Sequence, residues 1–371
     1  MNQGRASTAG ESVLSKPEFS PWLVWEGDSL HSSQREFTEL CRHIKSSGLL
    51  ERKPASRWFR AGIVLASLVL VSVGMVLWSH NLALQILNGT LLAFAFMQIG
   101  FLMHDVGHRQ ILRSAKINQV AGLLLANLMV GVSYSWWVDK HNRHHRNPNS
   151  VDLDPDVDFA PLAFSREQAA AKKWPWTFLV KHQAWLFVLL LLGEHFNLHV
   201  LAFDHVFRGR AKHGWAEGIL LVCHHLACVG IAFTILSPLP AIVFLVWSKA
   251  LAGLYAGMVF APNHKGMLMV GSGEQVNWLR QQVLTSRNVR PGPIYDFLYG
   301  GLNYQIEHHL FPFLRQDQLA AAQAIVRPFC LERGLRYHET GIFQSLKEIF
   351  CHLQEVGASV GVDDPVKILN P

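Results

Sequence analysis

Residues 82–108 read LALQILNGTLLAFAFMQIGFLMHDVGH, and this stretch decides the fold. Residues 82–103 contain no Asp, Glu, Lys or Arg, and a helix of that length crosses a hydrocarbon core of ~30 Å. The polar motif HDVGH follows directly at residues 104–108. The sequence therefore predicts a membrane-spanning helix that leads straight into a pair of histidines.

Three other stretches, 61–79, 217–236 and 239–262, are apolar over a similar length. The first forms a predicted hairpin with residues 82–103, and the other two form a second hairpin across a tight proline-containing turn at Ser237. We therefore expect an all-α integral membrane protein with about four transmembrane helices in two hairpins, together with interfacial helices and a cytosolic helical cap that carries a metal site.

Two further apolar stretches, 119–137 and 183–203, are less uniform. The second contains Glu194, His195 and His199, which are costly at the centre of a bilayer. We expect both stretches to form interfacial or partly inserted helices.

The composition supports a membrane protein. Of 371 residues, 50% are hydrophobic and only 16% are charged, whereas soluble proteins carry roughly 25% charged residues. The 22 Phe and 12 Trp exclude disorder for most of the chain. The net charge of +6 comes from basic residues that are spread along the chain and flank apolar segments. We therefore expect no nucleic-acid partner.

The distribution of Lys and Arg predicts the topology, because cytoplasmic loops near spans are enriched in both. Basic residues precede the first span at 42–60, whereas the short turn at residues 80–81 has no Lys or Arg. Both termini and every long polar segment are then cytoplasmic, and we expect the protein in a bacterial cell membrane.

Composition also divides the chain into predicted regions. Residues 37–44 place Phe37, Leu40, Cys41 and Ile44 at helical spacing, which predicts an amphipathic helix on the membrane surface. The predicted regions are a disordered tail (1–16), a cytosolic or interfacial amphipathic segment (17–60), the main membrane domain (61–357) and a second tail (358–371).

Histidine is unusually frequent, with 20 residues. Three clusters stand out, HDVGH at 104–108, HNRHH at 141–145 and QIEHH at 305–309, and all three fall on the predicted cytoplasmic side. Spacings of three and four residues place each set on one helix face. Imidazole suits iron, zinc, copper and nickel alike, but so many clustered histidines exceed the four ligands of a zinc site and indicate two metal ions.

With these three motifs, the chain resembles the membrane-bound fatty acid desaturases. The motifs match that family's three histidine boxes in order, spacing and placement relative to the spans, and the flanking GGLNYQIEHHLFP at 300–312 adds specificity. Gln305, which replaces the first histidine of the third box, is similar to the front-end branch and to bacterial acyl-CoA and acyl-lipid desaturases. The resemblance covers about residues 20–357.

The resemblance implies that the box histidines ligate two non-haem irons and that His264, in the motif PNHK, supplies a further ligand. The implied metal ligands are His104, His108, His141, His144, His145, His264, His308 and His309.

Other residues around the boxes receive supporting roles. Asn263 would hold a metal-bound water, and Gln305 would act as a weak ligand or support a ligand. Asp105 would orient an imidazole of the first box, as carboxylates commonly do beside metal-binding histidines. The aromatic residues before the second box are candidates for the substrate tunnel: Tyr134, Trp136 and Trp137.

The implied reaction is the oxygen-dependent introduction of a double bond into a long acyl chain, carried as acyl-CoA or acyl-lipid. Forming the double bond supplies two electrons, and reducing dioxygen to two waters consumes four. Since no flavin, haem or nicotinamide motif is recognised, we expect a separate donor such as ferredoxin or a flavoprotein reductase. Five arginines are candidates to attract it: Arg143, Arg146, Arg280, Arg287 and Arg290.

Several alternatives remain at this stage. An acyl hydroxylase or an acetylenase would use the same boxes. Different classes are a membrane haem protein, a metal transporter and a zinc hydrolase, although transport would need polar groups throughout the spans.

The remaining signals are weaker. His224 and His225 lie inside the predicted span 217–236, where a polar residue is a candidate for function, yet they match no box. His195 and His199 are expected at the interface. The alternating aspartates at 152–158 lack the glycine and glutamate of a calcium loop and are expected to be solvated.

Overall fold

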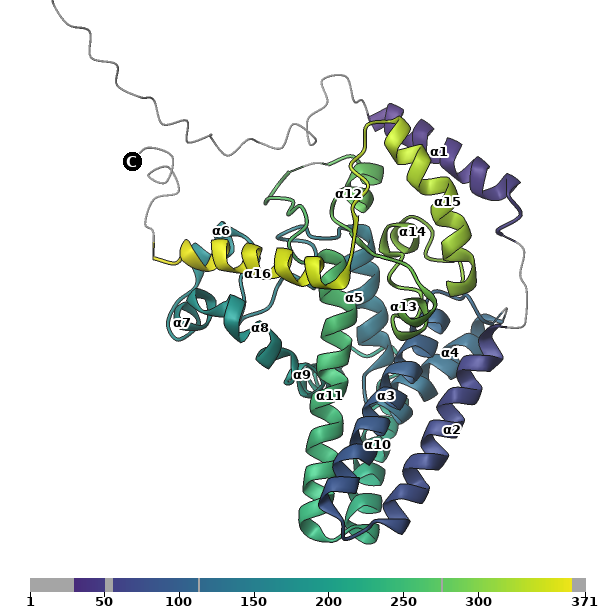
Figure 1. Ribbon diagram of the computed structural model, residues 1–371, viewed down its shortest axis with the longest axis vertical. Helices are drawn as coiled ribbons and strands as arrows, with labels where there is room; N and C mark the ends of the chain where they lie inside the picture. Colours follow the sequence, from purple (N-terminus) through teal and green to yellow (C-terminus); the bar gives the residue numbers. More distant parts are fainter. Residues whose placement is uncertain (1–29, 51–55, 113, 275, 362–371) are drawn as a thin grey trace, which may run out of the picture.

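The computed structural model describes residues 30–50, 56–112, 114–274 and 276–361. Within this part of the chain nearly every regular element is a helix, and the strands β1 (Asn288–Val289) and β2 (Glu339–Thr340) form one short parallel pair. Figure 1 shows a bundle of long helices below a broader group of shorter ones. The predicted all-α class is therefore confirmed.

Four helices are long and apolar enough to cross a membrane. They are α2 (Ser56–Leu77), α3 (Leu82–Gly107), α10 (Gly214–Ile235) and α11 (Pro238–His264). The predicted spans 61–79, 82–103, 217–236 and 239–262 correspond to them with shifts of a few residues at the ends. The main difference is that α3 and α11 continue beyond the predicted spans, so that His104 and His264 lie on their last helical turns.

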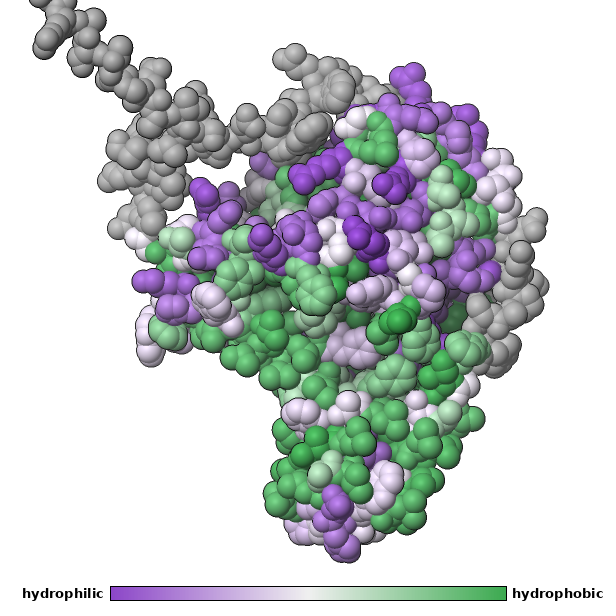
Figure 2. Space-filling model, viewed as in Figure 1, coloured by the Kyte–Doolittle hydropathy of each residue, from purple (hydrophilic) through white to green (hydrophobic). Residues whose placement is uncertain are grey.

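The surface of this bundle is apolar, as a lipid-facing surface requires. Leu65, Leu70 and Leu77 on α2 and Leu226 on α10 are each more than half exposed. Figure 2 shows the hydrophobic residues gathered over the helical bundle and the hydrophilic ones over the opposite end. The chain is thus an integral membrane protein with a polar cap at one end of its spans.

The two less uniform apolar stretches form bent helix pairs. Helix α4 (Ala115–Leu123) continues into the π-helix η1 (Leu124–Val130) and then bends by 105° into α5 (Tyr134–Arg146). Helix α8 (Gln183–Leu191) bends by 70° into α9 (Glu194–Phe207). Neither stretch is a straight span, and each bent pair could form either a broken span or a re-entrant loop, so the expectation of interfacial or partly inserted helices stays a prediction.

The cap, α1 and α12 to α16, packs over the bundle end that carries His104 and His264 (Figure 1). Two short helices, α6 and α7, lie along α16. The bounds are α1 (Leu30–Ser46), α6 (Arg166–Ala171), α7 (Trp176–Lys181), α12 (Trp278–Leu284), α13 (Pro293–Leu298), α14 (Gln305–Leu310), α15 (Gln316–Glu332) and α16 (Ile342–Ala358).

The predicted amphipathic helix is present as α1, but its predicted position on the membrane surface is wrong. Leu40 and Ile44 are fully buried in the cap core, where Val326 and Phe329 of α15 belong to the same cluster. The apolar stripe predicted the helix correctly, but a stripe of this kind fits a protein partner as well as a bilayer.

The predicted tail 1–16 and most of the predicted tail 358–371 lie outside the described residues, as does part of the segment 17–60. The predicted domain boundaries therefore stay predictions.

The packing of α11 against the bend between α8 and α9 can be tested at Gly253. A Cβ atom at this position would lie 2.7 Å from both the Leu191 carbonyl oxygen and the His195 amide nitrogen. These are backbone atoms at the bend between α8 and α9, so they cannot move aside as a flexible side chain would. We expect Gly253→Ala to cost about 1–3 kcal/mol and to lower the thermal unfolding midpoint in detergent.

The matched control is Gly230→Ala in α10, where an added Cβ has no heavy atom within 4 Å. This substitution is expected to leave the unfolding midpoint unchanged or slightly higher, since Ala favours helices over Gly. Equal midpoints for the two variants would contradict the described packing of α9 on α11.

Candidate metal centre

Four helices bring the histidines together at the junction of the bundle and the cap. Helix α3 carries His104 and is capped by His108, α11 ends at His264, and α5 and α14 carry the second and third boxes. Helix α5 starts here because the Ser133 hydroxyl accepts the Trp136 N–H and caps its first turn. All eight predicted histidines enter one of two groups whose ring nitrogens lie within 4.8 Å of one another.

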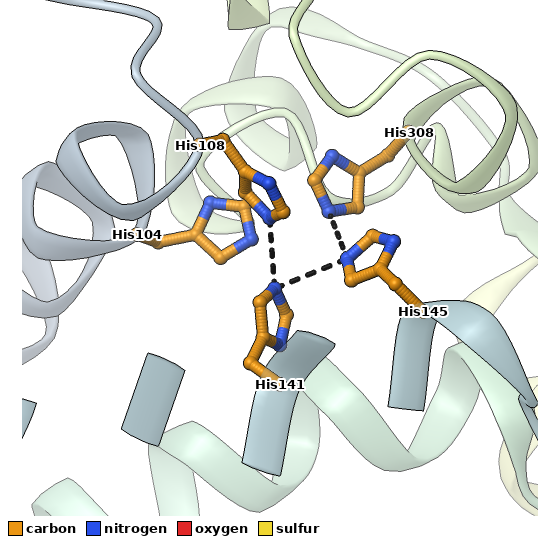
Figure 3. A group of neighbouring side chains, drawn as sticks. All are labelled: His104, His108, His141, His145 and His308. Atoms are coloured by element: carbon orange, nitrogen blue, oxygen red, sulfur yellow. Dashed lines mark hydrogen bonds between the residues drawn. The ribbon is translucent and has the colours of Figure 1, made fainter. Parts of the chain in front are cut away.

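The first group contains five imidazoles, His104, His108, His141, His145 and His308 (Figure 3). The Nε2 atom of His141 lies 2.8 Å from that of His108 and 3.1 Å from that of His145. The Nε2 atoms of His145 and His308 are also 3.1 Å apart. Figure 3 shows these rings pointing toward a common centre from three separate elements.

The second group contains three imidazoles, His144, His264 and His309, each oriented by a hydrogen bond from its Nδ1. The acceptors are Asp154 Oδ2 at 2.9 Å, the Thr285 carbonyl at 3.0 Å and Gln282 Oε1 at 2.9 Å, respectively. Because these oxygens accept, each Nδ1 carries the proton and each Nε2 presents a lone pair. The Nε2 atoms of His144 and His264 face each other at 3.3 Å.

The arrangement of these imidazole nitrogens is favourable with two metal ions bound and unfavourable without them. Two lone pairs that face each other repel unless a cation lies between them. Within the described part of the chain, His309 Nε2, His104 Nε2 and His145 Nδ1 are buried and have no hydrogen-bond partner. The two groups are adjacent, since the His145 and His309 rings stack with centroids 4.4 Å apart. Clustered neutral imidazoles with unpaired buried nitrogens are the expected state of a ligand set for late transition metals.

Burial keeps the third-box imidazoles in the form that binds metal. It lowers the pKa of both His308 and His309 well below the ordinary value, and the neighbouring histidines lower it further. Both rings are therefore neutral at physiological pH, so no proton competes with a metal for their lone pairs.

Asp154 is a site residue that the sequence did not reveal. The aspartates at 152–158 were expected to be solvated, but Asp154 is 1% exposed and bonds His144. Burial alone would raise the pKa of its carboxyl, but His144 and the Asn149 N–H hold it at about 2. The carboxylate is thus ionised and orients a predicted ligand. The alternation of aspartates was the only signal, and it did not indicate which one faces inward.

Helix α14 is held in place by a buried carboxyl that was not singled out either. Glu307 accepts hydrogen bonds from Asn288 Nδ2 and the Tyr337 hydroxyl, both at 2.7 Å. Burial raises the pKa of Glu307 to about 7 in spite of these bonds. Glu307 points away from the histidines next to it in the chain and ties them to β1 and the segment before β2.

The three predicted supporting residues lie near the centre. The Asp105 carboxylate accepts from Gln316 Nε2 at 3.2 Å and lies 3.7 Å from His104 Nδ1. Asn263 Nδ2 donates to Gln305 Oε1 at 3.0 Å, and Gln305 Nε2 donates to His264 Nε2 at 2.8 Å. In this geometry Asn263 orients Gln305, and Gln305 bonds the lone pair that a metal would use.

A cavity of about 260 Å³ adjoins both histidine groups. Its wall includes His104, His141, His144 and His264, and it continues between apolar side chains of α8, α9 and α11 such as Phe187, Leu198 and Phe260. Trp136 and Trp137 also line it. Tyr134 does not belong to this wall, and its ring packs instead where a Cβ on Gly122 would lie, 2.2 Å from Tyr134 Cζ.

The five arginines differ sharply in exposure. Arg143, Arg146 and Arg290 are exposed and therefore accessible to a partner, although Arg143 also pairs with Asp139 at 3.2 Å. Arg287 is fully buried and pairs with Glu348, and Arg280 is 6% exposed and lies 3.6 Å from Glu36. The expectation that all five attract a partner is therefore wrong for these two, which stabilise the cap.

These features define a helical integral membrane protein with a histidine-rich centre at one end of its spans. The chain matches the fatty acid desaturase family over residues 81–341. It belongs to this family, and it is an oxidoreductase of that type, so the transporter and zinc-hydrolase alternatives lose their support.

Individual relatives agree. A Delta(6)-fatty-acid desaturase of Caenorhabditis elegans is 30% identical over 87% of this chain and 76% of its own length. Fatty acid desaturase 3 of Bos taurus is 27% identical over 87% of this chain and 73% of its own. An acyl-lipid (9-3)-desaturase of Physcomitrium patens is 28% identical over 77% of this chain, which spans 56% of the length of that relative.

The role of Asp154 can be tested with Asp154→Asn. Because the amide carries no charge and can present its NH₂ group to His144, we expect about a 10–100-fold loss of metal affinity, measured by chelator competition on the purified protein. Asp152→Asn is the control, since Asp152 is exposed and contacts Ser272 rather than a histidine. Equal affinities in both variants would remove Asp154 from the site.

Proposed function

We propose that the protein is a membrane fatty acyl desaturase that introduces a double bond into a long acyl chain with dioxygen. The cavity carries this proposal, because it joins both histidine groups to an apolar passage between α8, α9 and α11. An extended hydrocarbon chain is the ligand that such walls favour. The names of the relatives, which include acyl-lipid and Delta(6)-fatty-acid desaturases, support the same reaction.

Two iron ions are the proposed cofactor, held by His104, His108, His141, His145 and His308 in one group and by His144, His264 and His309 in the other. Bound iron would supply the activation of dioxygen that removal of hydrogen from an unactivated methylene requires. The residues of the chain hold the ligand nitrogens unprotonated through Asp154, Thr285 and Gln282. They also keep the reacting carbons in a cavity with largely apolar walls.

The cavity wall favours a substrate that enters with its hydrocarbon part among aromatic and aliphatic side chains. Trp136 and Trp137 stand where the passage meets the histidines. The rings of His104 and Trp137 lie with their centroids 5.8 Å apart, so the indole limits the width of the cavity next to this proposed ligand. The proposed substrate is a long acyl chain as acyl-CoA or acyl-lipid.

Electron supply is the second requirement of the proposal. The double bond yields two electrons and the reduction of dioxygen to two waters takes four, so a donor must supply two. We propose a separate ferredoxin or flavoprotein reductase that docks beside the cap, where α5 is exposed. Arg143 and Arg146 are exposed on α5, the helix that carries the second box, and offer positive charge to an acidic donor.

The cap lies at one end of the spans (Figure 1), and it carries His308 and His309 on α14. These two histidines join the groups that contain His104 of α3 and His264 of α11, so both groups lie at that end. We propose that this end is cytoplasmic, because the basic residues 42–60 precede the first span and the turn at residues 80–81 has no Lys or Arg. In a cytoplasmic position, the histidine centre would also be accessible to soluble electron donors.

The proposal is tested by metal analysis and product analysis of detergent-purified protein beside His144→Ala. We expect about two irons per chain and no Soret band in the wild type, since two imidazole groups converge separately. The variant is expected to lose iron and to reduce unsaturated product, measured by mass spectrometry of the acyl chains, to background.

His80→Ala is the matched control, because His80 is an exposed histidine at the turn between α2 and α3. It should keep both iron and product. Zinc in place of iron, or activity without dioxygen, would refute the desaturase assignment. If the product is hydroxylated or acetylenic, the proposed iron centre stands, but the reaction is hydroxylation or alkyne formation and not desaturation.

A further inference from the structure

A further histidine group lies inside the helical bundle and shares no residue with the two groups of the box centre. It consists of His199 on α9 with His224 and His225 on α10, and their ring nitrogens lie within 4.8 Å of one another. His199 is 8% exposed and its ring packs against His225 of α10, while its expected position at the membrane interface stays a prediction. Histidines on two helices have therefore been brought together in a place where polar groups are costly.

The protonation of each ring is set by a backbone carbonyl. His224 Nδ1 lies 2.9 Å from the Leu128 oxygen, and His225 Nδ1 lies 2.8 Å from the Leu221 oxygen. His199 Nε2 lies 3.2 Å from the Val130 oxygen. Since a carbonyl only accepts, these three nitrogens carry the protons. The lone pairs are therefore on His199 Nδ1, His224 Nε2 and His225 Nε2.

Two of these carbonyls come from the end of the π-helix η1, where the last carbonyls have no partner within the helix. The chain turns there at Gly131 with φ of +84°. A Cβ on this residue would lie 2.5 Å from His224 Cδ2 and 3.0 Å from His199 Nε2. Glycine thus allows the backbone to approach both rings closely enough to orient them.

The lone pairs are left facing one another. His225 Nε2 lies 3.2 Å from His199 Nδ1, and neither nitrogen has a proton to donate once its ring is bonded to a carbonyl. Such a contact between two lone pairs is repulsive unless a cation, either a shared proton or a metal ion, lies between them, and this one is partly buried. The same arrangement, a ring N–H on a carbonyl and a lone pair on the metal, is the usual one for metal-binding histidine.

The surroundings restrict the charge of that cation. Lys249 Nζ lies 3.0 Å from His224 Nε2, and Cys228 Sγ lies 3.7 Å from the same nitrogen. His195 Nε2 is buried beside His199 and has no hydrogen-bond partner among the residues that the structure describes. Among the described residues, none of the hydrogen bonds or ion pairs of this group involves a carboxylate. Neutral ligands next to an ammonium favour an ion of low charge.

We propose that His199, His224 and His225 form a second metal site, separate from the box centre, for one late transition-metal ion, with Cu(I) as the best match. Three imidazoles suit copper and zinc, but Cu(I) adds a single positive charge and also accepts a thiol such as Cys228 as a soft ligand. Lys249 competes with the metal for the lone pair of His224. This proposal is independent of the reaction at the boxes.

The experiment uses the full-length protein, purified in detergent without a polyhistidine tag and with iron bound at the boxes. It is exposed to Cu(I) in a competing chelator, and copper and iron per chain are measured by mass spectrometry. We expect about one copper in the wild type and a loss of at least tenfold in affinity in His225→Ala, with iron unchanged. His182→Ala, which removes an exposed histidine before α8, should match the wild type.

A second variant keeps the proposal testable if His225→Ala fails to fold. Lys249→Met removes the competing ammonium while keeping an apolar chain against Phe96, over which Nζ now lies at 4.3 Å. Copper affinity is expected to rise roughly tenfold or more, because a like charge is removed from beside the metal. Copper-edge X-ray absorption should show imidazole nitrogens. If neither the wild type nor Lys249→Met retains copper or zinc, the cation is a shared proton and the metal site is refuted.

Discussion

An imidazole offers a lone pair in a buried site only if its other nitrogen has an acceptor for its proton, and the architecture around the boxes depends on this constraint. His144 relies on Asp154, His264 on the Thr285 carbonyl and His309 on Gln282. Two of these acceptors belong to α12 or its end, and Asp154 belongs to the loop after α5. The cap therefore serves the centre by fixing protons on the outer side of the rings.

The bilayer sets the second constraint, because spans must begin and end near its surfaces. The histidine centre lies beyond the apolar stretches of the spans. Helices α3 and α11 reach it because they extend past these stretches to His104 and His264. A ligand on the last turn of a long packed helix is held more rigidly than one on a loop. The cavity leads from this junction back between α8, α9 and α11, so the histidines adjoin an apolar passage.

Local patterns in the sequence predicted the features that depend on nearby residues. The four spans follow from runs of apolar residues, and the shared faces of the boxes follow from spacings of three and four. Features that depend on distant contacts were missed. The apolar face of α1 predicted its helix but not its burial against α15, and the aspartates at 152–158 did not reveal that Asp154 meets His144. Arg287 looked like surface charge because Glu348, its partner, is 61 residues away.

The two histidine-rich regions contain the same type of side chain but differ in the charged groups beside it. In both, oxygen acceptors fix the ring protons and leave lone pairs that face each other. They differ in net charge, because His144 is backed by the ionised carboxylate of Asp154, whereas His224 is faced by the ammonium of Lys249. A carboxylate behind a ligand raises its basicity and favours ions of higher charge, and an ammonium has the opposite effect. The charged group beside each set of rings would thus favour divalent or trivalent ions at the proposed box centre and a monovalent ion at the proposed site in the bundle.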